Sequence, residues 1–181
     1  MTDASWRLGP DDGELLILTG VTGPAAKMGH RLTIAMTSWQ ASVQWRGGEP
    51  AVAELTVGVD SLQVRSGEGG VTPLSGPEKT VVRSNALKSL NAKKYPEIRF
   101  STDGITKTAV GYRLDGTVEI HGKSRQQAVE LVIADQGDTW SLSAEVAVAQ
   151  TAFGVKPYSL LMGSMKVADE VKLQFTAIHS K

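Results

Sequence analysis

Three basic residues near position 30 form a polar cluster that could do chemistry. Lys27, His30 and Arg31 stand close together in the chain. Cations at this spacing could bind a diphosphate or a quinone oxygen. They could equally stand at the C-terminal end of a short helix, where the backbone dipole favours positive charge without any ligand. The sequence leaves both interpretations of His30 open, a contact to a ligand and a structural histidine.

Patterns that mark common enzymes are missing from the sequence. No Gly-x-Ser-x-Gly elbow and no His-Glu-x-x-His helix occurs, and the histidines at positions 30, 121 and 179 are far apart. The chain has no cysteine, which excludes thiolate metal sites, thiol nucleophiles and disulfides. We therefore expect no catalytic residue, no metal site and no cofactor.

Charge and length narrow the class of protein further. The 181 residues include 19 Lys plus Arg and 19 Asp plus Glu, so no net charge attracts the chain to nucleic acid. The length fits a single domain, which we place at residues 14–181, after a polar N-terminal segment at 1–13. That segment lacks the apolar run of a signal peptide, and no later stretch approaches the ~20 apolar residues of a transmembrane segment. The expected location is cytoplasmic.

Alternation of apolar and polar residues is the strongest pattern in the chain, and it indicates half-buried strands. It occupies the ranges 53–59, 98–100, 112–120, 129–133, 140–148 and 171–177. The stretch 32–45 also alternates, but its apolar residues change from even to odd positions partway. We interpret it as one long strand with a bulge near Thr37 and Ser38, which would give Leu32, Ile34, Trp39 and Val43 a common inner face.

Two segments break the β pattern. Ser75 and Glu78 have the spacing of a capping box with Pro77 in the first turn, which predicts a helix from about Pro77 to Leu90. The range 23–29 suits a shorter helix, and the glycine-rich range 66–70 is interpreted as a flexible loop. The fold class expected is all-β, an antiparallel β-barrel of about eight strands with two or three short helices.

A barrel of this size is either filled by side chains or holds one small ligand, and apolar inner faces favour an apolar ligand. Phe153 to Met162 suits a loop over one end of the barrel, either a lid or a plug. Aromatic residues on an inner face are core by default, so the sequence does not decide which of them line a cavity. Besides the basic cluster, the candidate ligand-binding residues are Ile34, Trp39, Phe100, Leu114, Val118, Leu142, Val146, Phe153, Tyr158, Met162, Leu173 and Phe175.

Several short segments follow one another in a characteristic order. They are Lys27-Met28-Gly29-His30, Trp39-x-Ala41-x-Val43-x-Trp45, Tyr95-Pro96-x-Ile98-x-Phe100, Asp115-Gly116-Thr117-Val118 and Phe153-Gly154-Val155-Lys156-Pro157-Tyr158. Together they resemble the YceI-like family, also called polyisoprenoid-binding, over roughly Glu14 to Ala177. The resemblance implies a bacterial protein with a lipocalin-like barrel that accommodates a polyisoprenoid, an isoprenoid quinone or a fatty chain.

The expected function is therefore the binding, storage or transport of a long-chain isoprenoid or other lipid. Two alternatives remain at this stage. The first is an enzyme of isoprenoid or quinone metabolism that uses the barrel as a reaction chamber, with His30 as general acid or base. The second is a filled barrel that acts as a protein interaction module. Whether the protein forms a homodimer is left open.

Overall fold

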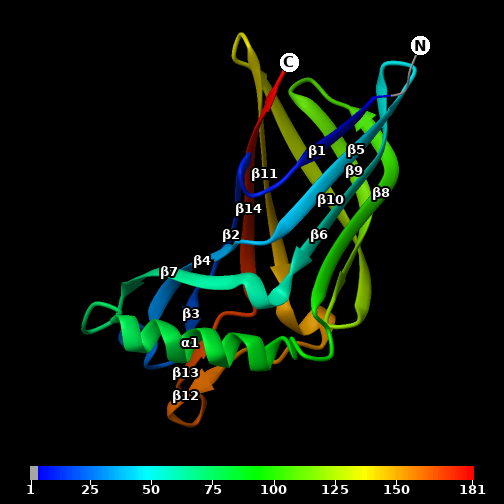
Figure 1. Ribbon diagram of the computed structural model, residues 1–181. Helices are drawn as coiled ribbons and strands as arrows, with labels where there is room; N and C mark the ends of the chain where they lie inside the picture. Colours follow the sequence, from blue (N-terminus) through cyan, green and yellow to red (C-terminus); the bar gives the residue numbers. More distant parts are fainter. Residues whose placement is uncertain (1–3) are drawn as a thin grey trace.

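One antiparallel sheet dominates the structure, a computed structural model that describes residues 4–181. Its strands are β1 (Ser5–Leu8), β2 (Gly13–Leu18), β4 (His30–Met36), β5 (Trp39–Arg46), β6 (Glu49–Gly58), β7 (Leu62–Gly69), β8 (Glu97–Lys107), β9 (Gly111–Ile120), β10 (Lys123–Asp135), β11 (Thr139–Ala149) and β14 (Glu170–Ser180). They are ordered β1-β5-β6-β8-β9-β10-β11-β14-β2-β4-β7. The sheet curls around a common interior, as Figure 1 shows.

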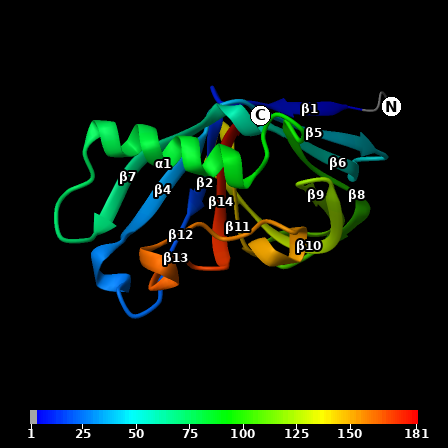
Figure 2. The ribbon, with the colours of Figure 1, turned by 90° about the horizontal axis from the view of Figure 1, so that it is seen from below.

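The two ends of the curled sheet differ. Across one end lie the helix α1 (Gly76–Ser89) and a small sheet of β12 (Ser159–Leu160), β13 (Met165–Val167) and β3 (Val21–Thr22), as Figures 1 and 2 show. We call this the mouth end. The opposite end, which we call the hairpin end, carries the β5–β6, β8–β9 and β10–β11 turns and the C-terminus. Short 3-10 turns complete the chain, namely η1 (Ala26–Met28), η2 (Val59–Ser61), η3 (Gln150–Phe153) and η4 (Leu161–Gly163).

The all-β class and the antiparallel pairing are confirmed, because the alternating segments each bury one face. On β9, Leu114 and Val118 are buried while Arg113 and Glu119 are exposed. The sheet has eleven strands where about eight were predicted. Long extended stretches are interrupted, by the Gly9–Asp12 turn before β2, by two residues before β5 and by η2 before β7, and each piece counts as a strand.

The phase change in residues 32–45 coincides with one of these interruptions. β4 ends at Met36 and β5 begins at Trp39, so Thr37 and Ser38 lie outside both strands. Leu32, Ile34 and Val43 face one interior, and Trp39 packs in the same core cluster as Ile34. The common inner face is confirmed, but the single long strand is wrong because the extra residues break the ladder.

The capping box begins α1 as the sequence predicts. Ser75 Oγ accepts a hydrogen bond from the Glu78 backbone N–H at 3.3 Å and donates one to Glu78 Oε1 at 3.0 Å. Pro77 occupies the first turn. The helix begins and ends one residue earlier than predicted, and the shorter helix expected at 23–29 is the 3-10 turn η1. Among residues 4–181, no helix has the length and apolar character needed to span a bilayer.

Two segments belong to the sheet although the sequence places them outside it. Within the N-terminal segment 1–13, Ser5–Leu8 pair with β5 and Leu8 is buried in the core, while residues 1–3 lie outside the described part of the chain. The glycine-rich range 66–70 is not a free loop, because Ser66 to Gly69 pair with β4 as part of β7. Both strands lie at the edges of the sheet order. β1 alternates over only four residues, and in β7 the alternation of Leu62 and Val64 ends at the glycines of its second half, so both signals are short.

Candidate ligand-binding cavity

A cavity of about 840 Å³ occupies the interior of the curled sheet. Every strand of the large sheet contributes lining residues, and α1 and the small sheet complete the wall at the mouth end. Small-molecule sites in proteins have volumes of roughly 300 to 1,000 Å³. The interior is therefore large enough for one ligand.

The wall of the cavity is overwhelmingly apolar. Inward side chains such as Ile17, Val146 and Leu173 are only half buried, because part of their surface faces the cavity rather than other side chains. The charged residues found along the described lining are Glu54, Glu78 and Lys166, and all of them are exposed to solvent. A long apolar group could fill the interior without meeting a buried, unpaired charge, which would be costly.

One side of the wall lacks a continuous ladder of backbone hydrogen bonds. β10 and β11 pair only where Val132–Asp135 oppose Trp140–Ser143, near the hairpin end. Toward the mouth end the two strands keep their outer partners, β9 and β14, but do not pair with each other within the described ladders. Val129 and Val146 line the cavity on either side of this unpaired stretch.

A glycine makes room for one of the lining aromatics. Phe100 on β8 lies opposite Val118 and extends over Gly116 of β9. A Cβ at Gly116 would come within 2.6 Å of the Phe100 ring and 2.5 Å of the Ser101 carbonyl oxygen. The missing side chain therefore allows the Phe100 ring to lie against the wall.

Most of the residues predicted from the sequence to contact a ligand line this cavity. They are His30, Ile34, Phe100, Leu114, Val118, Leu142, Val146, Phe153, Tyr158, Leu173 and Phe175. They come from both halves of the chain and are brought together by the curl of the sheet. Their role in binding stays a prediction.

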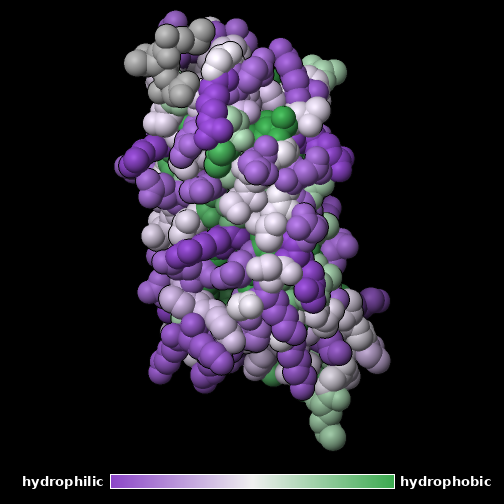
Figure 3. All heavy atoms as spheres, turned by 90° about the vertical axis from the view of Figure 1, so that its right-hand side faces the viewer, coloured by the Kyte–Doolittle hydropathy of each residue, from purple (hydrophilic) through white to green (hydrophobic). Residues whose placement is uncertain are grey.

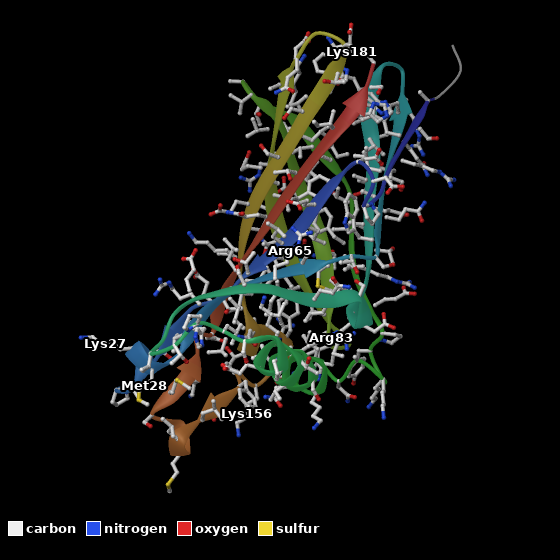
Figure 4. All side chains as sticks on the ribbon, turned by 60° about the vertical axis from the view of Figure 1, so that its left-hand side comes forward. Lys27, Met28, Arg65, Arg83, Lys156 and Lys181 are labelled. Carbon is white, nitrogen blue, oxygen red and sulfur yellow. The ribbon has the colours of Figure 1, made fainter. Side chains whose placement is uncertain are left out.

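Four predicted residues lie away from the cavity lining. Lys27 is exposed on η1 and points outward, as Figure 4 shows. Arg31 is on the outer face of β4, 3.9 Å from Glu68, because it alternates with the inward His30. Trp39 is only 5% exposed and is therefore core, whereas Met162 is fully exposed at η4. The expected basic cluster is thus divided, and only its histidine faces the cavity.

His30 has a partner within the protein. Its Nε2 lies 2.7 Å from the Thr72 carbonyl oxygen, and because a carbonyl only accepts, Nε2 must carry the proton. The ring packs against Gly70, where a Cβ would come within 2.6 Å of Nε2. His30 thus fixes the segment between β7 and α1, and this gives the structural interpretation of the residue a specific hydrogen bond.

The sequence missed the residues that form the mouth. Met28 and Met165 line it from η1 and the small sheet, two elements without a regular pattern, whereas Leu160 lies in the segment 153–162 that was expected over one end of the barrel. On α1, the lining residues Val82, Ala86 and Leu90 follow one another at four-residue spacing. That spacing was visible in the sequence and indicated an apolar side of the helix, but not that this side faces a cavity.

Aromatic rings pack against one another at the hairpin end of the cavity. Trp6 stacks on His179, with 3.9 Å between ring centroids and 7° between planes, and lies 5.1 Å from Trp45. Both tryptophans also line the cavity. Next to them, Lys181 Nζ lies 4.3 Å from the centre of the Trp140 ring, a cation–π contact.

The curled sheet has counterparts among known proteins. The sequence profile of the YceI-like domain matches residues 15–178. The crystal structure of Burkholderia cenocepacia BcnA is similar with a TM-score of 0.68 at 19% identity, covering 93% of this chain and 96% of that one. The Campylobacter jejuni YCEI protein gives a TM-score of 0.60 at 15% identity, covering 82% and 84%. No curated protein sequence matches, and identities this low show a shared fold alone.

Proposed function

The chain belongs to the YceI-like family, and from this premise we propose that it holds one long apolar ligand inside the curled sheet and stores or carries it without chemical change. The observation that carries the proposal is the apolar cavity of about 840 Å³, whose charged lining residues are all exposed. On this proposal the sheet works as a lipocalin-like barrel, with each interrupted pair of strands forming one continuous part of the wall.

The ligand class we propose is a polyisoprenoid, an isoprenoid quinone or a fatty chain. Burial of apolar surface supplies about 0.8 kcal/mol per CH₂, so the 20 carbons of four isoprene units contribute roughly 16 kcal/mol before the cost of association. The tail therefore supplies the affinity. Polar groups at the mouth, such as Tyr158 and Lys166, would set the orientation of a headgroup. A cytoplasmic location remains part of the proposal, and cell fractionation tests it.

Native mass spectrometry of the freshly purified protein tests the proposal directly. A ligand that dissociates slowly is expected as a defined mass added to that of the chain. Val146→Trp should remove this mass while the protein stays folded, since the side chain of Val146 faces the cavity and an open interior can accept the larger ring. Ala147→Trp is the matched control, because it adds the same ring to the exposed neighbour on the outer face.

Three other outcomes would reject the proposal. If the interior is packed, Val146→Trp should lose about 1 to 3 kcal/mol of stability, and the wild-type protein should carry no added mass. Turnover of the bound lipid by the purified protein, lost in His30→Ala, would indicate an enzyme. An interior that takes up neither xenon nor detergent would indicate a filled barrel and an interaction module.

A further inference from the structure

An apolar tip projects from the mouth end into solvent. Leu160, Leu161 and Met162 join β12 to β13, and the first two are 45% and 55% exposed while Met162 is fully exposed. Met28 of the adjoining η1 is 54% exposed. Figure 3 shows an apolar projection at the lower edge of a face that is otherwise largely hydrophilic. Single exposed apolar residues are ordinary on protein surfaces, but a cluster marks an interaction site.

The tip is held in a defined conformation. Leu161 and Met162 have φ values of 52° and 55°, in the left-handed region that side chains other than Asn, Asp or Gly rarely adopt. Ser164 fixes the turn, since its backbone N–H and its Oγ both donate to the Leu161 carbonyl oxygen, at 3.1 and 2.6 Å. Asn or Gly would suit this backbone better. Two large apolar side chains at strained positions point to a role outside the fold.

Positive charge surrounds the tip. The two segments that build this region, 19–29 and 155–168, contain Lys27, Lys156 and Lys166 and no acidic residue. All three lysines are exposed. Figure 4 shows Lys27 and Lys156 at the same end of the molecule as Met28.

Carboxylates near the mouth already have partners. Glu78 of α1 accepts a hydrogen bond from Ser75. Asp169 accepts two from Thr151, from its backbone N–H at 2.8 Å and its Oγ1 at 2.7 Å. Asp169 keeps its negative charge and lies close enough to Lys166 for that lysine to contribute to its lowered pKa. Lys27 and Lys156 form no ion pair in the described part of the chain, and they are the lysines available to an external anionic surface.

We propose that the mouth end docks on an anionic lipid bilayer, with the tip inserted at the interface and the lysines among the headgroups. Apolar insertion and basic charge act together in peripheral membrane binding, where either alone is weak. A second copy of the chain fits this surface poorly, because symmetric pairing would bring the lysines of the two copies together. Docking does not depend on which ligand the cavity holds.

The geometry links docking to the cavity. Met28 and Leu160 belong to the exposed apolar surface and also line the cavity. A mouth placed on a bilayer would therefore open toward lipid rather than water, so an apolar chain could pass between the two without crossing solvent.

Flotation with vesicles tests the proposal on the whole protein. Wild type should bind phosphatidylcholine vesicles that contain phosphatidylglycerol and should bind pure phosphatidylcholine much less. The triple variant Leu160→Ser, Leu161→Asn, Met162→Asn should weaken binding at least about tenfold. Lys156→Gln should weaken it about fivefold, which is about 1 kcal/mol per charge converted at 1.36 kcal/mol per tenfold. Val110→Ser, an exposed apolar position at the hairpin end, is the control and should change nothing.

Site-specific labelling gives an independent measurement. The chain has no cysteine, so Met162→Cys can carry a single environment-sensitive fluorophore. Its emission should shift to the blue with anionic vesicles, and the same label on Val110→Cys should not shift. Because asparagine adopts left-handed backbone more readily than leucine or methionine, the triple variant should melt no lower than wild type, and lost binding will not reflect unfolding.

Four results would overturn docking. They are no binding of wild type to anionic vesicles, undiminished binding by the triple variant, equal shifts at both labels, and a dimer in sedimentation velocity that the triple variant abolishes while vesicles are not bound. A protein that retains its ligand but never binds vesicles loses the docking proposal and keeps the proposed function. If the protein binds vesicles but its cavity holds no ligand, the docking proposal is kept and the proposed function is lost.

Discussion

At the hairpin end, aromatic rings that line the cavity pack against one another, whereas at the mouth end α1 and the small sheet leave apolar lining residues facing solvent. Trp6 lies between His179 and Trp45 in the first region. In the second, Met28 and Leu160 touch both the cavity and the surface. Apolar side chains are exposed at both ends, as Val110 shows at the hairpin end, but within the described residues the large apolar side chains that are both exposed and part of the cavity lining lie at the mouth end.

This difference implies that the hairpin end contributes more to stability and the mouth end more to binding. Apolar surface that packs against other side chains lowers the free energy of the fold, while apolar surface left in water does not. Elements that open for a ligand are drawn from the less stable parts of a protein. We therefore expect substitutions at the two ends to affect stability unequally and ligand or membrane binding in the opposite order.

The largest expected effect is at the hairpin end. Trp6→Ala should lower the free energy of unfolding by about 2 to 3 kcal/mol, less than for a fully buried tryptophan because Trp6 is half buried. Tyr158→Ala, which removes an aromatic residue at the mouth, should lower it by less than about 1 kcal/mol. Urea denaturation measures both. Equal losses would remove the distinction between the ends.

The sequence predicted the elements that carry a long local signal and missed those in which the signal is short. Alternation identified β9, β11 and β14, and the capping box identified α1, because these signals are local. β1 and β7 also alternate, with Trp6 and Leu8 or Leu62 and Val64 on the buried side, but each does so over only four residues, which is too short a stretch to identify a strand. The strand count failed for a similar reason, as interruptions such as Thr37 and Ser38 alter hydrogen bonding without altering composition.

The candidate site was predictable where it coincides with the inner face of a strand. Leu114, Val146 and Leu173 line the cavity because parity alone fixes the face on which they lie. Parity also explains why Arg31 does not line the cavity as predicted, since a residue next to the inward His30 must point outward. Met28 could not be found, because its position depends on how η1 packs against β13, a long-range contact with no sequence pattern.

A second prediction concerns the partner of His30. His30→Ala removes the hydrogen bond to the Thr72 carbonyl oxygen and should lower the free energy of unfolding by about 1 kcal/mol. It should also raise hydrogen exchange in the segment between β7 and α1. His30→Gln can still offer an N–H and should recover part of the loss. Unchanged exchange in His30→Ala would contradict the structural role.

The apolar tip allows a prediction of opposite sign. Leu161→Asn and Met162→Asn should each raise the free energy of unfolding by up to about 1 kcal/mol, because asparagine adopts positive φ more readily than leucine or methionine. Leu160→Ser is the matched control and should bring no gain, since Leu160 has an ordinary φ of −129°. Thermal unfolding measures all three. A loss of stability in both asparagine variants would show that the tip supports the fold.

The smallest effect expected is electrostatic and compares one exposed carboxylate at each end. At the mouth end, hydrogen bonds from the Thr151 side chain and backbone lower the pKa of Asp169 below the ordinary 3.8. At the hairpin end, a hydrogen bond from Lys181 and another from the Gly137 backbone lower the pKa of Asp135. Exposed pairs of this kind contribute little to stability.

The sign of the pH dependence follows from these directions. A carboxylate whose pKa is lower in the folded than in the unfolded protein stabilises the fold above the unfolded value, and this contribution is lost as the pH falls through the folded value. Thr151→Val should raise the pKa of Asp169 and leave that of Asp135 unchanged. Lys181→Gln should raise the pKa of Asp135 and leave that of Asp169 unchanged. NMR titration of the carboxyl carbons measures both. Because the two ends share no partner, each carboxylate in the double variant should show the same pKa shift as in the corresponding single variant. A different shift at either carboxylate would mean that the ends are coupled through the strands that join them.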